Sequence, residues 1–134
     1  MVLIDTHTHL FAEEFDSDRT EAVQRAIAAG VKKFFLPNID SSSIAGMLAL
    51  EKEFPENCLS MMGLHPGSVN EKYGEELKLV EDWLGKRKFS AVGEIGMDYF
   101  HDRTFIPQQK DVFSKQIDLA KKYNLPVVIH QREC

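Results

Sequence analysis

Short apolar runs alternate strictly with amphipathic segments along this chain, and that order limits its fold more than any other feature. The apolar runs occupy residues 2–4, 33–36, 59–64, 91–95 and 127–130. Each segment between two runs carries apolar residues at helical spacing, so the pattern predicts five strands and four helices. Strict alternation indicates parallel strands joined by right-handed crossovers.

Residues with known boundary preferences mark the ends of the predicted helices. Gly30 and Asn124 suit helix C-termini because both accept a left-handed backbone conformation. Asp40 or Ser41 can cap the second helix, and Pro107 suits the first turn of the fourth. The helical segments therefore have defined starts and stops.

An open doubly wound sheet and a (β/α) barrel of TIM type both fit this order of elements. Reactive side chains follow or end four different strands: residues 5–9, His65, Glu94 and His130. Because convergence from several strands is typical of barrels, we expect an α/β fold with a parallel (β/α) barrel. A complete barrel needs roughly 250 residues. We therefore expect residues 1–134 to form the first half of one barrel domain.

Composition narrows the class of protein. A hydrophobic content of 43% is globular, and no stretch approaches the roughly 18 apolar residues of a membrane span. Asp5 comes too early for a secretory signal, so we expect a cytoplasmic protein without a membrane partner. The net charge of −5 means that a nucleic-acid substrate would depend on bound cations for much of its attraction. Two cysteines, Cys58 and Cys134, do not indicate a disulfide framework.

The motif DTHTH at residues 5–9 begins where the first apolar run ends. In an extended segment, residues two apart point to the same side, so His7 and His9 can approach one cation together. Imidazole suits zinc and other first-row divalent metals, and Asp5 could orient a ligand ring or bind metal itself. Two surface histidines on a loop are the alternative; the strand-end position and Asp5 favour the metal.

The fourth and fifth runs each deliver a polar side chain from an apolar strand. Burying Glu94 is costly unless a cation or a donor compensates, and a carboxylate can bridge two divalent ions; a buried salt bridge is the alternative. His130 ends the fifth run and is either a ligand or a satisfied core residue. Asp98 follows Glu94 and either binds substrate or caps a turn.

Three further side chains have open roles. His65, between Gly63 and Gly67, could bind a substrate phosphate or simply fix a tight turn. Arg132 offers a planar fork suited to phosphate, or is a solvated basic residue. The aromatic loop around His101 could stack a base or pack in the core.

Taken together, these motifs resemble the TatD family of metal-dependent deoxyribonucleases, within the amidohydrolase superfamily of (β/α) barrels. The resemblance rests on the order and spacing of five motifs over the whole chain. They are IDTHTHL at residues 4–10, GLHP at 63–66, VGEIGMDY at 92–99, Pro107 with Gln109, and PVVIHQR at 126–132.

The resemblance implies a two-metal site in which His7 and His9 hold one ion, Glu94 bridges both and His130 holds the second. Glu94 and His130 would thus be the catalytic residues in this chain. His65, Asp98 and Arg132 are expected to contact the substrate, with DNA as that substrate. The ions would be zinc, magnesium, manganese or nickel. The family's remaining ligands, a histidine after the sixth strand and an aspartate after the eighth, lie beyond these motifs, so we expect little turnover from this chain alone.

Two other accounts are compatible with the sequence. One is amide or ester hydrolysis by another branch of the superfamily; that branch commonly carries a modified lysine on the fourth strand, where this chain has Glu94. The other is a non-catalytic, truncated metal-binding fragment. Because residues 127–130 would form an exposed edge strand, we also expect self-association or pairing with a C-terminal half.

Overall fold

Five parallel strands and four α-helices alternate along the chain in the computed structural model, which describes residues 1–134. The strands are β1 (Leu3–Asp5), β2 (Val31–Pro37), β3 (Cys58–Met61), β4 (Val92–Asp98) and β5 (Val127–Arg132). The helices are α1 (Arg19–Ala28), α2 (Ser41–Glu53), α3 (Tyr73–Lys86) and α4 (Ile106–Lys122), and two short 3-10 turns are η1 (Glu13–Phe15) and η2 (Pro66–Ser68). The predicted number, type and order of elements are confirmed.

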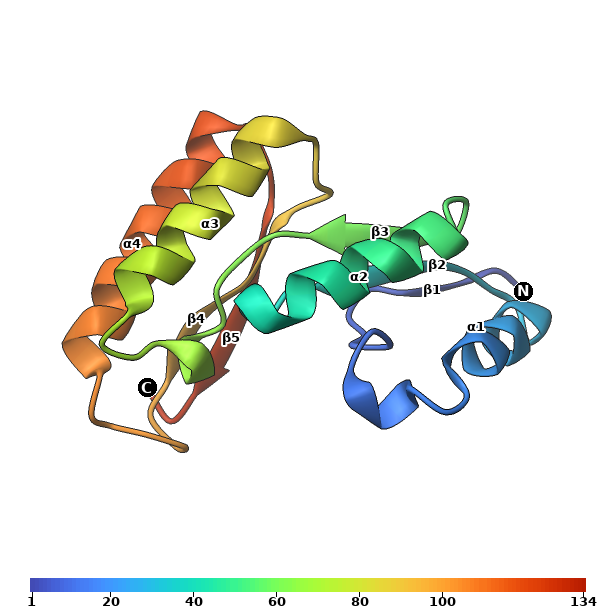
Figure 1. The fold of residues 1–134 in the computed structure, drawn as a ribbon, viewed down its shortest axis with the longest axis horizontal. Coiled ribbons are helices and arrows are strands. Elements are labelled where there is room, and N and C mark those ends of the chain that lie inside the picture. Colours follow the sequence, from blue (N-terminus) through green and yellow to red (C-terminus); the bar gives the residue numbers. More distant parts are fainter.

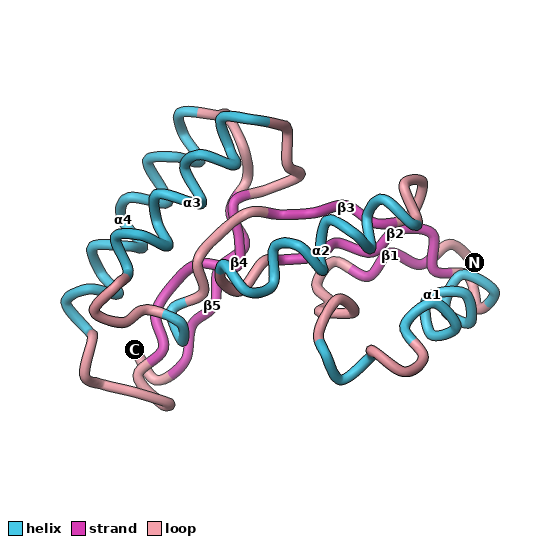
Figure 2. The backbone as a smooth tube through the Cα atoms, viewed as in Figure 1, coloured by secondary structure: helices cyan, strands magenta, loops and turns pink.

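The strands form two ladders that share one direction. In the first ladder β1, β2 and β3 are neighbours in that order, and in the second β4 pairs with β5. A single bridge between Met62 and Val92 joins the ladders, with the Gly93 amide donating to the Met62 carbonyl at 3.0 Å. Figures 1 and 2 show the resulting bend: β1–β3 run to one side with α1 and α2, and β4–β5 to the other with α3 and α4.

Local sequence explains where α2 begins and α4 ends, whereas contacts between strands explain why β3 is shorter than predicted. The Asp40 side chain accepts from the Ser42 amide and forms a capping box with Ser43, as its position before α2 predicts. Asn124 adopts the predicted left-handed conformation after α4, with φ of 52°. The third strand ends at Met61 rather than residue 64, because beyond Met62 the chain leaves the β2 ladder and passes against Gly93.

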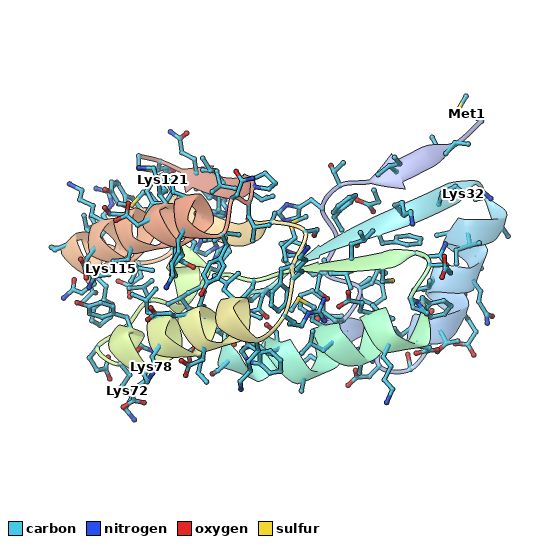
Figure 3. All side chains as sticks on the ribbon, turned by 90° about the horizontal axis from the view of Figure 1, so that it is seen from above. Met1, Lys32, Lys72, Lys78, Lys115 and Lys121 are labelled. Atoms are coloured by element: carbon cyan, nitrogen blue, oxygen red, sulfur yellow. The ribbon has the colours of Figure 1, made fainter.

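The core is one cluster of eighteen buried apolar residues drawn from both ladders and all four helices. Lysines lie on the outer surfaces of the helices, as Figure 3 shows for Lys78 on α3 and Lys115 on α4. The outer strands remain partly uncovered: Ile4 on β1 and Ile129 on β5 are each more than half exposed. None of the helices has both the length and the apolar character needed to cross a bilayer. The expected self-association through the last strand stays a prediction.

Candidate metal centre

The carboxyl ends of the strands bring four histidines and one glutamate to the same place. His7 and His9 follow β1, His65 follows β3, and Glu94 and His130 lie within β4 and β5. The Thr8 amide donates to the Phe35 carbonyl at 3.0 Å, which ties the segment after β1 to β2. Residues from four strands therefore share one end of the sheet, the arrangement expected of a barrel active site.

The first histidine group has the spacing of ligands around a cation. Nε2 of His7 lies 3.3 Å from Nε2 of His9, and these atoms lie 3.1 and 3.4 Å from Glu94 Oε2. Ligands about 2.0–2.1 Å from a tetrahedral metal are about 3.3–3.4 Å apart, and imidazole and carboxylate are suitable ligands for such an ion. The donor set and its geometry therefore fit a divalent metal.

A second group gathers on the other oxygen of the same carboxylate. Nδ1 of His130 lies 3.0 Å from Glu94 Oε1, and Nε2 of His65 lies 3.2 Å from that nitrogen and 3.7 Å from Oε1. Glu94 thus offers one oxygen to each group. A carboxylate that faces two ligand sets in this way can bridge two ions.

The electrostatics of the centre keep Glu94 charged despite its burial. Burial alone raises the pKa of the Glu94 carboxyl. Its histidine neighbours, first among them His9, outweigh burial and lower this pKa to about 2. Burial also lowers the pKa of His65, although the charge of Glu94 opposes that change. The centre is therefore an anion surrounded by imidazoles near neutral pH, a combination suited to binding cations.

The ring of His130 is oriented from behind by Asp98. Nε2 of His130 lies 2.9 Å from Asp98 Oδ2, and Nδ1 lies 3.0 Å from Glu94 Oε1. With a cation bound at Glu94, Nδ1 would present its lone pair to the cation and Nε2 would carry the hydrogen. Gly96 permits this strand packing: it adopts a φ of 146°, and a Cβ there would overlap the His130 carbonyl. The fifth strand thus delivers His130 in one orientation.

Asp98, which the resemblance places at the substrate, is almost fully buried. Its side chain is 1% exposed, and both oxygens accept hydrogen bonds from within the protein. Burial raises the pKa of Asp98, but hydrogen bonds led by that of His101 hold the pKa well below its usual range. Asp98 is therefore a buried carboxylate within hydrogen-bond distance of His130, and its expected contact with substrate stays a prediction.

Two buried glutamines of α4 hold the backbone beside the centre. Gln109 accepts from the Asp98 amide at 2.8 Å and donates to the Asp98 carbonyl at 2.9 Å. Gln116 makes the same pair of bonds with Leu64, the residue before His65, at 2.7 and 3.1 Å. Each glutamine thus replaces a missing strand partner and fixes the segment that carries Asp98 or His65.

The loop around His65 sets the tautomer of that ring. Nδ1 accepts a hydrogen bond from the Gly67 amide at 2.9 Å, so in the neutral ring the hydrogen lies on Nε2. The His65 amide donates to the Ile39 carbonyl, and Ser68 donates to Asp40, which ties the loop to α2. Nε2 of His65 therefore points into the centre as a donor, although its position alone would also suit a metal ligand.

A comparison with protein-family models matches residues 4–134 to the family described as "TatD related DNase". The chain belongs to the TatD family. The resemblance seen in the motifs is therefore confirmed, and the TatD match covers the four strand ends that form the centre.

Individual TatD relatives are similar over nearly the whole chain. An uncharacterized metal-dependent hydrolase, YabD of Bacillus subtilis, is 35% identical over 98% of this chain and 51% of its own length. A TatD protein of Erwinia tasmaniensis named 3'-5' ssDNA/RNA exonuclease is 29% identical over 98% of this chain and 51% of its own. The crystal structure of the TatD homologue YjjV of Escherichia coli has a TM-score of 0.88 and 36% identity, over 98% of this chain and 51% of that chain. The chain spans about half the length of the TatD relatives it matches, which confirms the fold as half of a (β/α) barrel.

Arg132 and His101 both lie in or beside the loop that follows β4. The guanidinium of Arg132 lies 3.7 Å from the ring centre of Phe100 and makes no hydrogen bond or ion pair within the chain, so its expected contact with substrate stays a prediction. His101, which sequence reasoning placed only in an aromatic loop, lies with Nδ1 2.8 Å from Asp98 Oδ2. The spacing of three residues between Asp98 and His101 was the available signal, but it is common in loops and carries little weight alone.

Proposed function

We propose that this centre binds two divalent metal ions and belongs to a hydrolase that cleaves phosphodiester bonds in nucleic acid. The observation that carries the proposal is the position of Glu94, which gives Oε2 to His7 and His9 and Oε1 to His130. One buried carboxylate shared by two sets of imidazoles is costly without cations and well suited to two of them. On this proposal, residues 1–134 are one part of a single barrel domain.

The side chains of the centre have different roles in this proposal. His7, His9, Glu94 and His130 would hold the ions, which would lower the pKa of a bound water and neutralise charge on the phosphate. Asp98 holds His130 so that Nδ1 faces the centre. His65 carries its hydrogen on Nε2 and would donate it to a phosphate oxygen that enters beside Glu94.

Nucleic acid is the favoured substrate because a TatD relative is named for exonuclease action on single-stranded DNA and RNA. The chain has a net charge of −5, so much of the attraction for such a polyanion would have to come from ions at the centre.

The first experiment is to measure metal content of the purified chain by elemental analysis, followed by cleavage of an end-labelled single-stranded DNA with manganese, magnesium, zinc or nickel. We expect close to two ions per chain and, because little turnover is expected of this chain alone, slow cleavage that chelation abolishes. Bound metal without cleavage of DNA or RNA would leave a metal-binding, non-catalytic chain as the better account. Absence of bound metal at saturating concentrations would contradict the proposed centre.

A further inference from the structure

We propose that His101 is a positioning residue of the metal centre: through Asp98 it fixes the imidazole of His130 so that Nδ1 faces Glu94. The proposal rests on the proposed function, because it assumes a metal ion between Glu94 and His130. It goes further in giving a role to a loop residue that neither binds metal nor touches substrate.

The argument starts from how the Asp98 carboxylate is held. Oδ1 accepts from the backbone amides of Phe100 and His101, at 3.0 and 3.1 Å. Oδ2 lies 2.8 Å from Nδ1 of His101 and 2.9 Å from Nε2 of His130. The oxygen that faces His130 therefore has one other partner, and that partner is the His101 ring.

The two histidines share one acceptor, and this fixes their tautomers. Oδ2 of Asp98 lies within hydrogen-bond distance of both rings and accepts from each when Nδ1 of His101 and Nε2 of His130 carry hydrogen. In that arrangement Nδ1 of His130, 3.0 Å from Glu94 Oε1, keeps its lone pair for a cation bound at Glu94. Two lone-pair atoms at that distance call for a cation or proton between them, so the tautomer set from Asp98 is the one that prepares His130 for metal.

Removing the His101 ring would loosen one oxygen and leave the other in place. Any residue at position 101 keeps the backbone amides that bind Oδ1, whereas Oδ2 would be held by His130 alone. The carboxylate could then turn about its Oδ1 contacts, and His130 would lose its fixed partner. The His101 ring is mostly exposed while Asp98 is buried, so the ring links the surface loop to the centre.

A purely structural role for His101 is the competing account. In that case the ring would only stabilise the loop after β4, and its loss would lower thermal stability without a selective effect on His130. Phe100 supplies a matched control in the same loop. Its side chain contacts the Arg132 guanidinium and lies edge-on to the His101 ring, with the ring centres 5.1 Å apart. Its only bond to Asp98 is through the backbone amide, so Phe100→Ala removes aromatic packing from the loop but keeps the His101 ring and the bonds to Asp98.

The test compares His101→Ala, His101→Asn and Phe100→Ala with the unchanged chain in two measurements. The first is nitrogen-15 NMR of the histidine side chains in metal-free protein, which reports the tautomer of His130. The second is titration with Co²⁺ followed by its visible absorption. Asn places an amide N–H close to the position of the imidazole Nδ1, so it tests rescue.

We expect His101→Ala to shift His130 from the Nε2–H tautomer towards a mixture and to weaken one of two Co²⁺ binding steps about threefold to tenfold, less than the roughly 10- to 100-fold typical of a direct outer-shell partner. His101→Asn should restore most of both signals, and Phe100→Ala should change neither. An unchanged His130 tautomer in His101→Ala would overturn this inference while leaving the metal centre intact. A lack of Co²⁺ binding by the unchanged chain would instead contradict the proposed function, and the NMR result would still decide the role of His101.

Discussion

The two histidine groups that meet at Glu94 differ in how their rings are held. In the group after β1, the side chains of His7 and His9 are 39% and 31% exposed, and the buried Nδ1 of His9 has no hydrogen-bond partner. In the other group, His65 and His130 are 18% and 21% exposed. Both of their outward nitrogens have partners, the Gly67 amide and Asp98.

This contrast shows that two groups with the same kinds of ligand can differ in how well they are prepared to bind a metal ion. A histidine ligand usually donates its other ring N–H to a carboxylate or carbonyl, which fixes its orientation and strengthens the ligand. His130 has that support from Asp98. The rings of His7 and His9 have no such partner, and Asp5 binds only the backbone amide of His7. We therefore expect the position between Glu94 and His130 to be the better organised of the two.

The largest expected effect comes from the residue that the two groups share. Glu94→Gln should abolish tight binding at both positions, a loss of roughly 100-fold or more, because each loses its only carboxylate. Isothermal titration with Zn²⁺ or Mn²⁺ measures the loss. Glu51→Gln is the control, because Glu51 binds Arg87 and Ser60 away from the histidines and its loss should leave metal binding unchanged. One position filling with normal affinity in Glu94→Gln would show that the carboxylate is not shared.

The next effect should separate the two positions. Asp98→Asn leaves one acceptor oxygen, which cannot serve both the two imidazoles and the backbone amides of Phe100 and His101, so binding at the Glu94–His130 position should weaken roughly 10- to 100-fold. The His7–His9 position should change little. Asp5→Asn is the matched change on the other side, and because Asp5 accepts only from a backbone amide, its effect should be smaller. Equal losses from both variants would remove the contrast between the groups.

The same contrast separates what the sequence predicts, the ligands, from what it does not predict, the partners that hold those ligands. Three patterns in the sequence predict much of the structure. The hydrophobic period predicts the order of strands and helices, and residue preferences predict the cap at Asp40. The positions of strand ends predict that one end of the sheet gathers His7, His9, Glu94 and His130. The partners of those ligands do not follow from these patterns. Asp98 reaches His130, 32 residues later, because β4 and β5 are in register at Gly96 and His130. Such contacts depend on strand register and loop path, which spacing along the chain does not encode.

A third effect should appear in stability, where the two parts of the sheet are joined. Asn38 is fully buried; its side-chain amide donates to the carbonyls of Gly63 and Asp40, and its backbone carbonyl accepts from the Glu94 amide. Asn38→Ala keeps the backbone bond but leaves the carbonyls of Gly63 and Asp40 without their side-chain donor, which should cost about 1–3 kcal/mol. Chemical denaturation measures the free energy of unfolding. Asn57→Ala, which removes one exposed bond to Lys32, should cost far less, and a comparable loss would argue against a special joint at Asn38.

The smallest effect concerns thiol reactivity in the same two regions. Cys58 lies buried on β3, and burial, reinforced by the charges of Glu51 and Glu53, raises the pKa of its thiol to about 11. Cys134 is exposed beside β4, with its thiol near the Met97 carbonyl. At pH 8 we expect a soluble thiol reagent to modify Cys134 at once and Cys58 only as the β1–β3 ladder opens, because the thiolate is the reactive form.

The sign of the pH dependence follows from the raised pKa of Cys58. The folded chain holds this thiol protonated, so its contribution to stability is complete below the ordinary thiol pKa and is lost as pH rises towards about 11. Mass spectrometry of the modified protein in increasing denaturant would then give the opening free energy of the β1–β3 ladder. If Cys58 reacts as fast as Cys134 in the absence of denaturant, the first ladder opens locally under native conditions. The ladder that precedes His7 and His9 would then be less stable than the rest of the sheet, in line with the weaker support of those two rings. Asn38→Ala should accelerate the modification of Cys58 further.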